Sequence, residues 1–318
     1  MRRRLASFVA VTLLAMQPPS TQAKGIELDS REYKLMLEPA HFAGGTPAEA
    51  VDEFLRDQMK GAIRESFGGD AADELARKGV DLEKHRSVRF LDTQGYVLND
   101  NGFALRERID LDDNDRPASK PEITLKFRSS DLFLAADMRL KAKAEGAESK
   151  LEEDIGPLSL TNAGERFVAS PRSARSQFSR STSQTVKQSD LPRTLEDIDK
   201  LYPTFSEDLQ LVADEIDLQA ALKSGPEYRE LVYRSSRLDV TKDTKAKFAL
   251  TIWYEGVDNQ NRPALTEISF SYDTDHGVVP AEAAQRARRL LLVMQDLDWA
   301  KPDAPTKTAL AACPDTPS

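Results

Sequence analysis

Polar and apolar side chains alternate with a period of two along most of the chain. In a strand, this period places successive side chains on opposite faces, so each run predicts a strand with one polar and one apolar face. The predicted strands cover Ser30–Leu37, Ser87–Leu91, Gly102–Leu111, Glu122–Arg128, Lys150–Ile155, Glu230–Val240, Lys247–Tyr254 and Ala264–Tyr272.

Helical patterns lie between these runs and after the last of them. Thr46, Pro47 and Glu49 supply an N-cap, a first-turn proline and a capping-box acid, and they predict a helix that ends at Gly68. The last helix opens at Pro280, and its apolar spacing indicates a face packed on a sheet. Shorter helices are expected over Asp70–Lys78, Thr194–Leu201 and Glu215–Leu222.

One long segment, from about residue 169 to residue 190, is rich in Ser and Arg and poor in apolar residues. This composition predicts a mobile loop, either a solvated linker, which it favours, or a binding lid.

The two ends of the chain differ in composition from the rest. Three arginines precede a short apolar run, Leu5–Met16, and small residues follow as far as Ala23. Residues 1–23 are therefore predicted to be a signal peptide, so that the protein is exported to the periplasm or secreted, with an uncleaved membrane anchor as the alternative. Residues 24–300 are predicted to form one domain, and the proline-containing residues 301–318 a disordered tail.

Composition narrows the function classes. The chain has 53 acidic against 44 basic residues and a net charge of −9, which argues against a nucleic-acid partner. A single cysteine, Cys313, excludes an intramolecular disulfide and a thiolate zinc cluster. The motifs of P-loop, Rossmann and hydrolase-elbow enzymes are absent from the sequence.

The polar strand faces carry charges of both signs. In the strand that begins at Gly102, Arg106 and Arg108 share the face opposite Phe103 and Leu105. Two structures fit this pattern: a half-exposed sheet with a solvated charged face, or a closed barrel whose charged faces converge on a wet lumen while helices cover its apolar exterior.

In the barrel, the charged faces would form an anion site. The cations are Lys34, Arg106, Arg108, Lys126, Arg128 and Arg237. Carboxylates that would face the same space are Glu32, Glu152, Asp154, Glu267 and Asp273. Cations beside carboxylates suit a phosphate chain bound together with a hard divalent ion.

Several motifs resemble those of one superfamily. Phe90-Leu91-Asp92-Thr93 looks like its "YFDT" element, and Gly102 to Arg108 resembles its "G-x-x-L-R-x-R" strand. Further similar motifs are Thr124-Leu125-Lys126, Glu32-Tyr33-Lys34, Lys150–Asp154 and Thr266–Ser269. In this order they resemble the CYTH-like or triphosphate tunnel metalloenzyme superfamily, which includes class IV adenylyl cyclases, thiamine triphosphatases and inorganic triphosphatases.

The resemblance implies an α+β fold, an antiparallel eight-stranded β-barrel with helices packed outside and a charged tunnel within. It implies triphosphate or polyphosphate binding by the six cations, with Mg²⁺ or Mn²⁺ on Glu32, Glu152, Asp154 and Glu267. Two positions depart from the pattern, since Ser30 and Ser269 stand where carboxylates are expected.

We therefore expect a divergent, exported member of this superfamily that binds such an anion. It is either a metal-dependent hydrolase of phosphoanhydride bonds or a non-catalytic anion-binding envelope protein with a degenerate metal site. No nucleic acid and no membrane insertion after signal cleavage are expected.

Overall fold

A computed structural model describes residues 25–158, 173–256, 262–304 and 306–307. The strands are β1 (Ser30–Leu37), β2 (Val80–Thr93), β3 (Phe103–Asp110), β4 (Glu122–Ser129), β5 (Glu148–Pro157), β6 (Ala174–Thr185), β7 (Leu222–Ser224), β8 (Tyr228–Ser235), β9 (Leu238–Asp239), β10 (Lys245–Glu255) and β11 (Leu265–Asp273). The helices are η1 (Pro39–Phe42), α1 (Pro47–Glu53), η2 (Phe54–Met59), α2 (Lys60–Ser66), α3 (Gly69–Lys78), α4 (Val97–Asp100), α5 (Leu132–Asp137), η3 (Gln188–Asp190), α6 (Leu195–Leu201), α7 (Phe205–Gln210) and α8 (Ala281–Met294).

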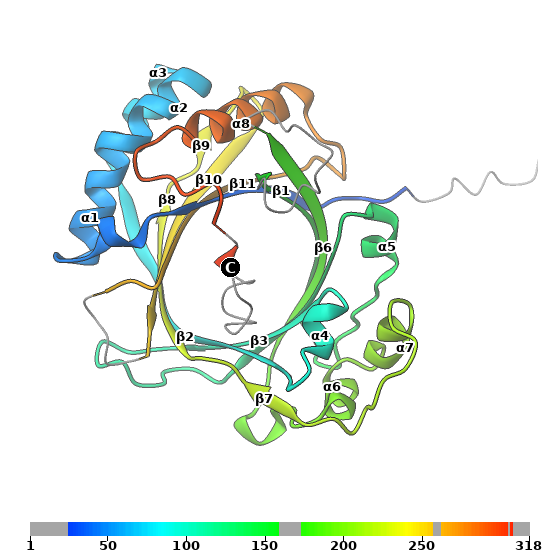
Figure 1. The fold of residues 1–318 in the computed structure, drawn as a ribbon. Coiled ribbons are helices and arrows are strands. Elements are labelled where there is room, and N and C mark those ends of the chain that lie inside the picture. Colours follow the sequence, from blue (N-terminus) through cyan, green and yellow to red (C-terminus); the bar gives the residue numbers. More distant parts are fainter. Residues whose placement is uncertain (1–24, 159–172, 257–261, 305, 308–318) are drawn as a thin grey trace, which may run out of the picture.

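Nine of these strands close into a barrel, seen end-on in Figure 1, in the order β11-β1-β5-β6-β4-β3-β2-β8-β10, with β10 pairing back to β11. The pairs around the ring are antiparallel except β1 with β5, which is parallel. The expected α+β fold, a barrel with helices packed outside, is confirmed. The strand number and the all-antiparallel order are corrected to nine strands with one parallel pair.

The additional strand is β6, so the predicted mobile loop over residues 169–190 is wrong where the structure describes it. β6 pairs with β4 on one side and β5 on the other. Its inward side chains, such as Ser181 and Ser183, line a polar interior, while Phe178 on the other face packs against an outer core. Hydrogen bonding on both edges overrides the weak strand propensity of a Ser-rich segment.

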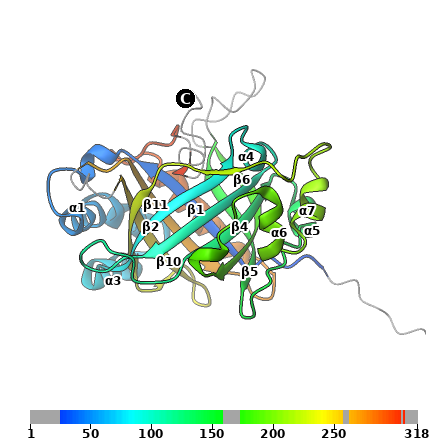
Figure 2. The ribbon, with the colours of Figure 1, turned by 90° about the horizontal axis from the view of Figure 1, so that it is seen from below.

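Two apolar cores lie outside the barrel. The first joins the outer faces of β1, β8, β10 and β11 to α1, η2, α2, α3 and α8. The second joins β3, β4 and β5 to α5, α6 and α7, which Figures 1 and 2 show on the other side of the ring. The helices therefore cover the apolar outer faces of the strands. The inward faces are mainly polar, apart from a smaller apolar cluster formed by Val88, Phe90, Tyr228 and Trp253.

Local sequence signals account for several of these elements. The capping box of Thr46 and Glu49 is present at α1, and the predicted first helix continues through the π-turn η2 into α2. Asp92 accepts hydrogen bonds from the backbone N–H groups of Thr93, Leu98 and Asn99, and so holds the turn through α4 that leads into β3.

Gly102 immediately precedes β3 and has a φ of 78°, and a Cβ there would lie 2.7 Å from the carbonyl oxygen of Arg128. A residue with a side chain could not fit there without displacing the β4 backbone. Gly102 therefore allows the chain at the start of β3 to lie close to the β4 backbone at Arg128.

Other predicted elements need correction. The helix predicted over Glu215–Leu222 is absent, because this segment runs beside the start of α6, where Leu195 and Glu196 donate backbone hydrogen bonds to the carbonyls of Ala220 and Leu218. The predicted strand Glu230–Val240 is divided into β8 and β9. The predicted signal peptide, residues 1–23, lies outside the described residues.

None of the described helices combines the length and apolar character that crossing a membrane requires.

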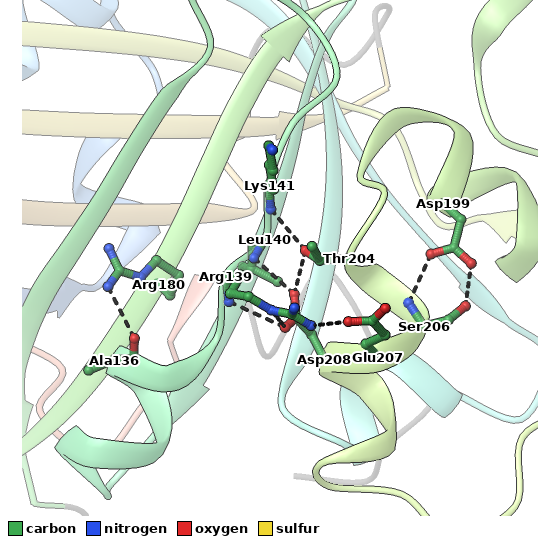
Figure 3. A network of polar contacts seen from close by, with 10 residues as sticks. All are labelled: Ala136, Arg139, Leu140, Lys141, Arg180, Asp199, Thr204, Ser206, Glu207 and Asp208. Carbon is green, nitrogen blue, oxygen red and sulfur yellow. Dashed lines mark hydrogen bonds and ion pairs between the residues drawn. The ribbon is translucent and has the colours of Figure 1, made fainter.

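A buried carboxylate ties the second group of helices to the barrel, as Figure 3 shows. Asp208 on α7 is fully buried, and it accepts hydrogen bonds from the Leu140 backbone N–H at 2.9 Å and from the Thr204 hydroxyl at 2.8 Å. Arg139 approaches the same carboxylate to 3.3 Å and also pairs with the exposed Glu207. Asp208 thereby fixes the chain between α5 and β5 against α7.

We predict that Asp208→Asn lowers the free energy of unfolding by about 2 to 3 kcal/mol, because an amide NH₂ would face donors and leave buried groups unpaired. Urea denaturation of the variant and the parent protein measures this loss. Glu207→Gln is the control, and it should have no measurable effect since that ion pair is exposed. Equal loss in both variants would contradict this role of Asp208.

Candidate functional site

The inward faces of the barrel strands surround one cavity, with a volume of about 1320 Å³, which we call the tunnel. Of the two structures that the charge pattern allowed, the closed barrel is the one present. The polar faces predicted for β3, β4, β5 and β11 all line it. The described lining holds 13 Lys and Arg against nine Asp and Glu, an excess of positive charge inside a protein with a net charge of −9.

One side of the tunnel carries a group of cations on three neighbouring strands, which we call the cationic wall. Its members are Arg86 on β2, Arg106 and Arg108 on β3, and Lys126 and Arg128 on β4. In the strand pairing, Arg106 lies beside Thr124 and Lys126 beside Ala104, so the cations of neighbouring strands are staggered rather than directly opposite one another. Four of the five were predicted, and Arg86 was missed because it lies one residue before the predicted start of its strand.

Burial and mutual repulsion weaken the protonated form of the two central arginines. Desolvation, followed by the charge of Arg108, holds the pKa of Arg106 well below its usual value. Desolvation lowers the pKa of Arg108 to about 10 against the opposing attraction of Glu230. Within the described chain, Arg106 makes no hydrogen bond or ion pair, and its buried Nε has no partner. A desolvated guanidinium without a protein partner would be stabilised by an anion that enters the tunnel.

Glu230 on β8 is the buried carboxylate beside this wall, and it was not among the predicted site residues. It pairs with Arg86, lies 3.8 Å from Arg108, and accepts a 2.9 Å hydrogen bond from the indole nitrogen of Trp253. Burial raises the pKa of Glu230, but Arg108 and Arg86 outweigh burial and hold it far below the usual range. Glu230 therefore orients two arginines and leaves Arg106 free.

The opposite side of the tunnel, on β1, β5 and β11, holds the four predicted metal ligands, and we call it the acidic wall: Glu32, Glu152, Asp154 and Glu267. Asp154 is its centre, because Lys34 lies 2.9 Å and Lys126 3.3 Å from its oxygens, and Arg128 lies at 3.7 Å. Burial opposes ionisation of Asp154, yet these cations keep its pKa well below the usual range.

The remaining acidic groups also have partners. Glu32 pairs with Lys34 at 2.8 Å, and Glu267 pairs with Lys307 at 2.7 Å. Ser30, which replaces an expected carboxylate, donates a 2.9 Å hydrogen bond to Glu152. Ser269, at the other departure, lies opposite Lys34 in the β1–β11 pairing.

These residues do not fit a divalent metal in this arrangement. Mg²⁺ and Mn²⁺ need several free oxygen ligands, but each of the four carboxylates already faces a Lys or Arg nitrogen or a hydroxyl. Over the described ranges, no group of three or more His, Cys, Asp or Glu side chains could hold a metal ion. The four predicted ligands therefore share a wall without forming a metal site.

Arg237 differs from the other predicted cations. It follows β8 and lies at the margin of the tunnel, where it pairs with Asp273 at 3.2 Å, and both side chains are more than 60% exposed. Water screens such a pair, so Arg237 contributes less than the wall residues to the field inside.

The described lining defines a closed barrel with a cationic wall facing an acidic one. No protein-family model matches the chain, and no curated protein matches its sequence. Similar solved structures include HpAC1 from Hippeastrum, named as an adenylyl cyclase and described with a dominant triphosphatase activity, at 12% identity over 91% of this chain and 97% of that chain, TM-score 0.40.

Two other solved structures are named as adenylate cyclases. The one from Bacillus halodurans has 12% identity over 89% of this chain and 96% of that chain, TM-score 0.37. The one from Vibrio parahaemolyticus has 12% identity over 90% and 98%, TM-score 0.31. The chemistry of the site is set by the residues that line the tunnel.

Lys126 yields a prediction for the pH dependence of stability. Desolvation, aided by the neighbouring cations, lowers its pKa to about 8 despite the attraction of Asp154. Between pH 8 and the ordinary lysine value near 10.4, the unfolded chain binds a proton that the folded protein does not, so stability should rise with pH over this window.

Relative to Lys126→Met, the free energy of unfolding of the parent protein should increase by about 2 to 3 kcal/mol from pH 8 to pH 10.5. Urea denaturation across this range measures the difference. A constant difference between the two proteins would show that the Lys126 pKa is not lowered.

Proposed function

We propose that the protein binds a triphosphate- or polyphosphate-type anion through the cationic wall of its tunnel. The observation that carries this proposal is Arg106, which lies inside a closed barrel with no protein partner among the described residues. Glu230 and Glu122 attract Arg106 from a distance, but neither forms an ion pair with it. A desolvated cation without a direct partner is costly, and an anionic ligand would offset that cost.

The shape of the wall favours an elongated anion over a single phosphate. Neighbouring strands lie about 4.8 Å apart, so cations on β2, β3 and β4 extend across roughly 10 Å. Guanidinium groups present planar pairs of donors to phosphate oxygens, and Lys126 adds a point charge. A chain of phosphates can contact all three strands at once, whereas one phosphate cannot.

Hydrolysis of the bound chain is the second candidate function, which the CYTH-like resemblance implies. The observation in its favour is that Glu32, Glu152, Asp154 and Glu267 line the same tunnel as the cationic wall. The pairing of all four with protein groups favours binding without metal-dependent turnover. Anion binding is therefore the function proposed first.

Export to the periplasm or the cell exterior is proposed from the sequence alone. It rests on the three arginines and the short apolar run that begin the chain. There the protein would act as an anion-binding envelope protein.

We predict that Arg106→Met weakens tripolyphosphate binding by about 10- to 100-fold, because charge-assisted hydrogen bonds contribute about 1.5 to 3 kcal/mol. Isothermal titration calorimetry at fixed ionic strength measures the change. Arg289→Met is the matched control, since this exposed arginine on α8 pairs with Glu65 outside the tunnel. Equal affinities of the Arg106 variant and the control would overturn the proposal.

Thermal unfolding with phosphate, pyrophosphate and tripolyphosphate tests the preference for an elongated anion. Stabilisation should increase with chain length in the presence of EDTA, reaching about 2.7 kcal/mol for a ligand at 100 times its dissociation constant. A single phosphate that stabilises as well as tripolyphosphate would contradict an extended site.

A phosphate-release assay with tripolyphosphate and Mg²⁺ or Mn²⁺ separates the two candidate functions. We expect no release above that of Arg106→Met. Metal-dependent phosphate release by the parent protein that is lost in Arg106→Met would contradict binding without turnover and would show that the protein is a hydrolase.

A further inference from the structure

The C-terminal segment enters the tunnel after α8. Ala300 bridges to Leu37 at the end of β1, and the Lys301 backbone N–H donates to the Met36 carbonyl at 2.8 Å. Beyond this point, residues 302–304, 306 and 307 line the tunnel, and Figures 1 and 2 show the segment at the opening at one end of the barrel. The tail predicted to be disordered is therefore placed in these residues, and the rest of it lies outside the described chain.

Lys307 brings a positive charge onto the acidic wall. Its Nζ lies 2.7 Å from Oε1 of Glu267, a side chain that is only 3% exposed, and 5.9 Å from the centre of the Trp253 ring. The approach to Oε1 is not aligned as a hydrogen bond, so the contact is electrostatic. The ammonium group of Lys307 therefore supplies a positive charge beside a buried carboxylate, as a small metal ion would.

The influence of Lys307 extends beyond Glu267. Burial opposes ionisation of Glu32, Lys34 favours it, and Lys307 adds to the lowering of the Glu32 pKa. The charge of Lys307 also helps to lower the pKa of Glu230 on β8, after burial and the two arginines. One ammonium group thus acts on carboxylates from three strands of the barrel.

We propose that Lys307 takes the place of a divalent metal ion on the acidic wall, so that the tunnel binds its phosphate-type anion without metal. This inference rests on the proposed function and deepens it. Without Lys307, Glu267 would be a buried charge lacking its partner and would repel an anion in the same cavity. Because Ser30 and Ser269 stand where carboxylates are expected, the acidic wall carries less negative charge, and a single ammonium group can balance more of it.

Calorimetry of tripolyphosphate binding tests the inference in EDTA and in Mn²⁺. The parent protein should bind equally well in both, within about twofold, whereas Lys307→Met should bind about tenfold more weakly in EDTA and recover in Mn²⁺. Lys301→Met is the matched control, because this lysine of the same segment pairs with the exposed Glu38, and it should resemble the parent protein.

A second measurement uses Mn²⁺ alone, with free Mn²⁺ followed by electron paramagnetic resonance. Lys307→Met should take up Mn²⁺ more tightly than the parent protein, because removing the ammonium frees carboxylate oxygens. Equal uptake by the two proteins would overturn the inference.

The double variant Glu267→Gln/Lys307→Met controls for loss of folding. It removes both partners of the buried pair, and it should recover tripolyphosphate binding in EDTA if Lys307 acts by neutralising Glu267. A double variant as weak as Lys307→Met would overturn this role of Lys307.

The inference and the proposed function fail in different ways. If the parent protein binds no tripolyphosphate in either condition, the proposed function fails. If it binds and Lys307→Met binds equally well in EDTA, the inference about Lys307 fails and the proposed function stands.

Discussion

Closure of the sheet on itself is the constraint on which the rest of the structure depends. An open sheet could direct its charged face to bulk water, but a barrel directs the charged faces of all its strands into one space. Each charged side chain inside the barrel either pairs with an opposite charge or a hydrogen-bonding group, or its desolvation destabilises the folded protein. Asp154 among Lys34, Lys126 and Arg128, and Glu230 beside Arg86, are solutions to this constraint. Among the described residues of the cationic wall, Arg106 makes no ion pair or hydrogen bond through its side chain.

The two walls differ in how their charged side chains are partnered. On the acidic wall, the protein provides its own cations and a serine hydroxyl, so the carboxylates are satisfied before any ligand arrives. On the cationic wall, Glu230 and the more distant Glu122 pair with only two arginines, Arg86 and Arg108, and positive charge remains in excess. This asymmetry gives the interior a sign opposite to that of the whole chain, and it is the basis for an anion as the partner.

The strands that could be predicted from sequence are those whose outer faces need apolar side chains. In β3 and β4, Phe103, Leu105 and Phe127 pack against helices, so alternation is strong and Arg106 and Lys126 fall on the correct face. β6 was missed because its two faces are both largely polar, and its strand state depends on hydrogen bonds to β4 and β5.

The positions of Glu230 and Lys307 could not be predicted for a related reason. Glu230 acquires its role from arginines on β2 and β3, far from it in sequence, and Lys307 belongs to a segment whose composition is that of a disordered tail. Pairing of this kind depends on tertiary structure, which no local pattern contains. The motif carboxylates were placed in the tunnel correctly, but local patterns did not indicate that Asp154 would pair with Lys34 on β1 and Lys126 on β4, or Glu267 with Lys307.

The position of β1 between β5 and β11 has a consequence for folding kinetics. Its pairing joins Ser30 to Asp273 and also to Glu152, so the ring is completed by contacts between residues that are distant along the chain. Loop-closure entropy makes such contacts slow to form, and they can form only when β11 is available. The barrel therefore cannot close progressively during synthesis from the N-terminus, and its assembly should be a late, largely post-translational event.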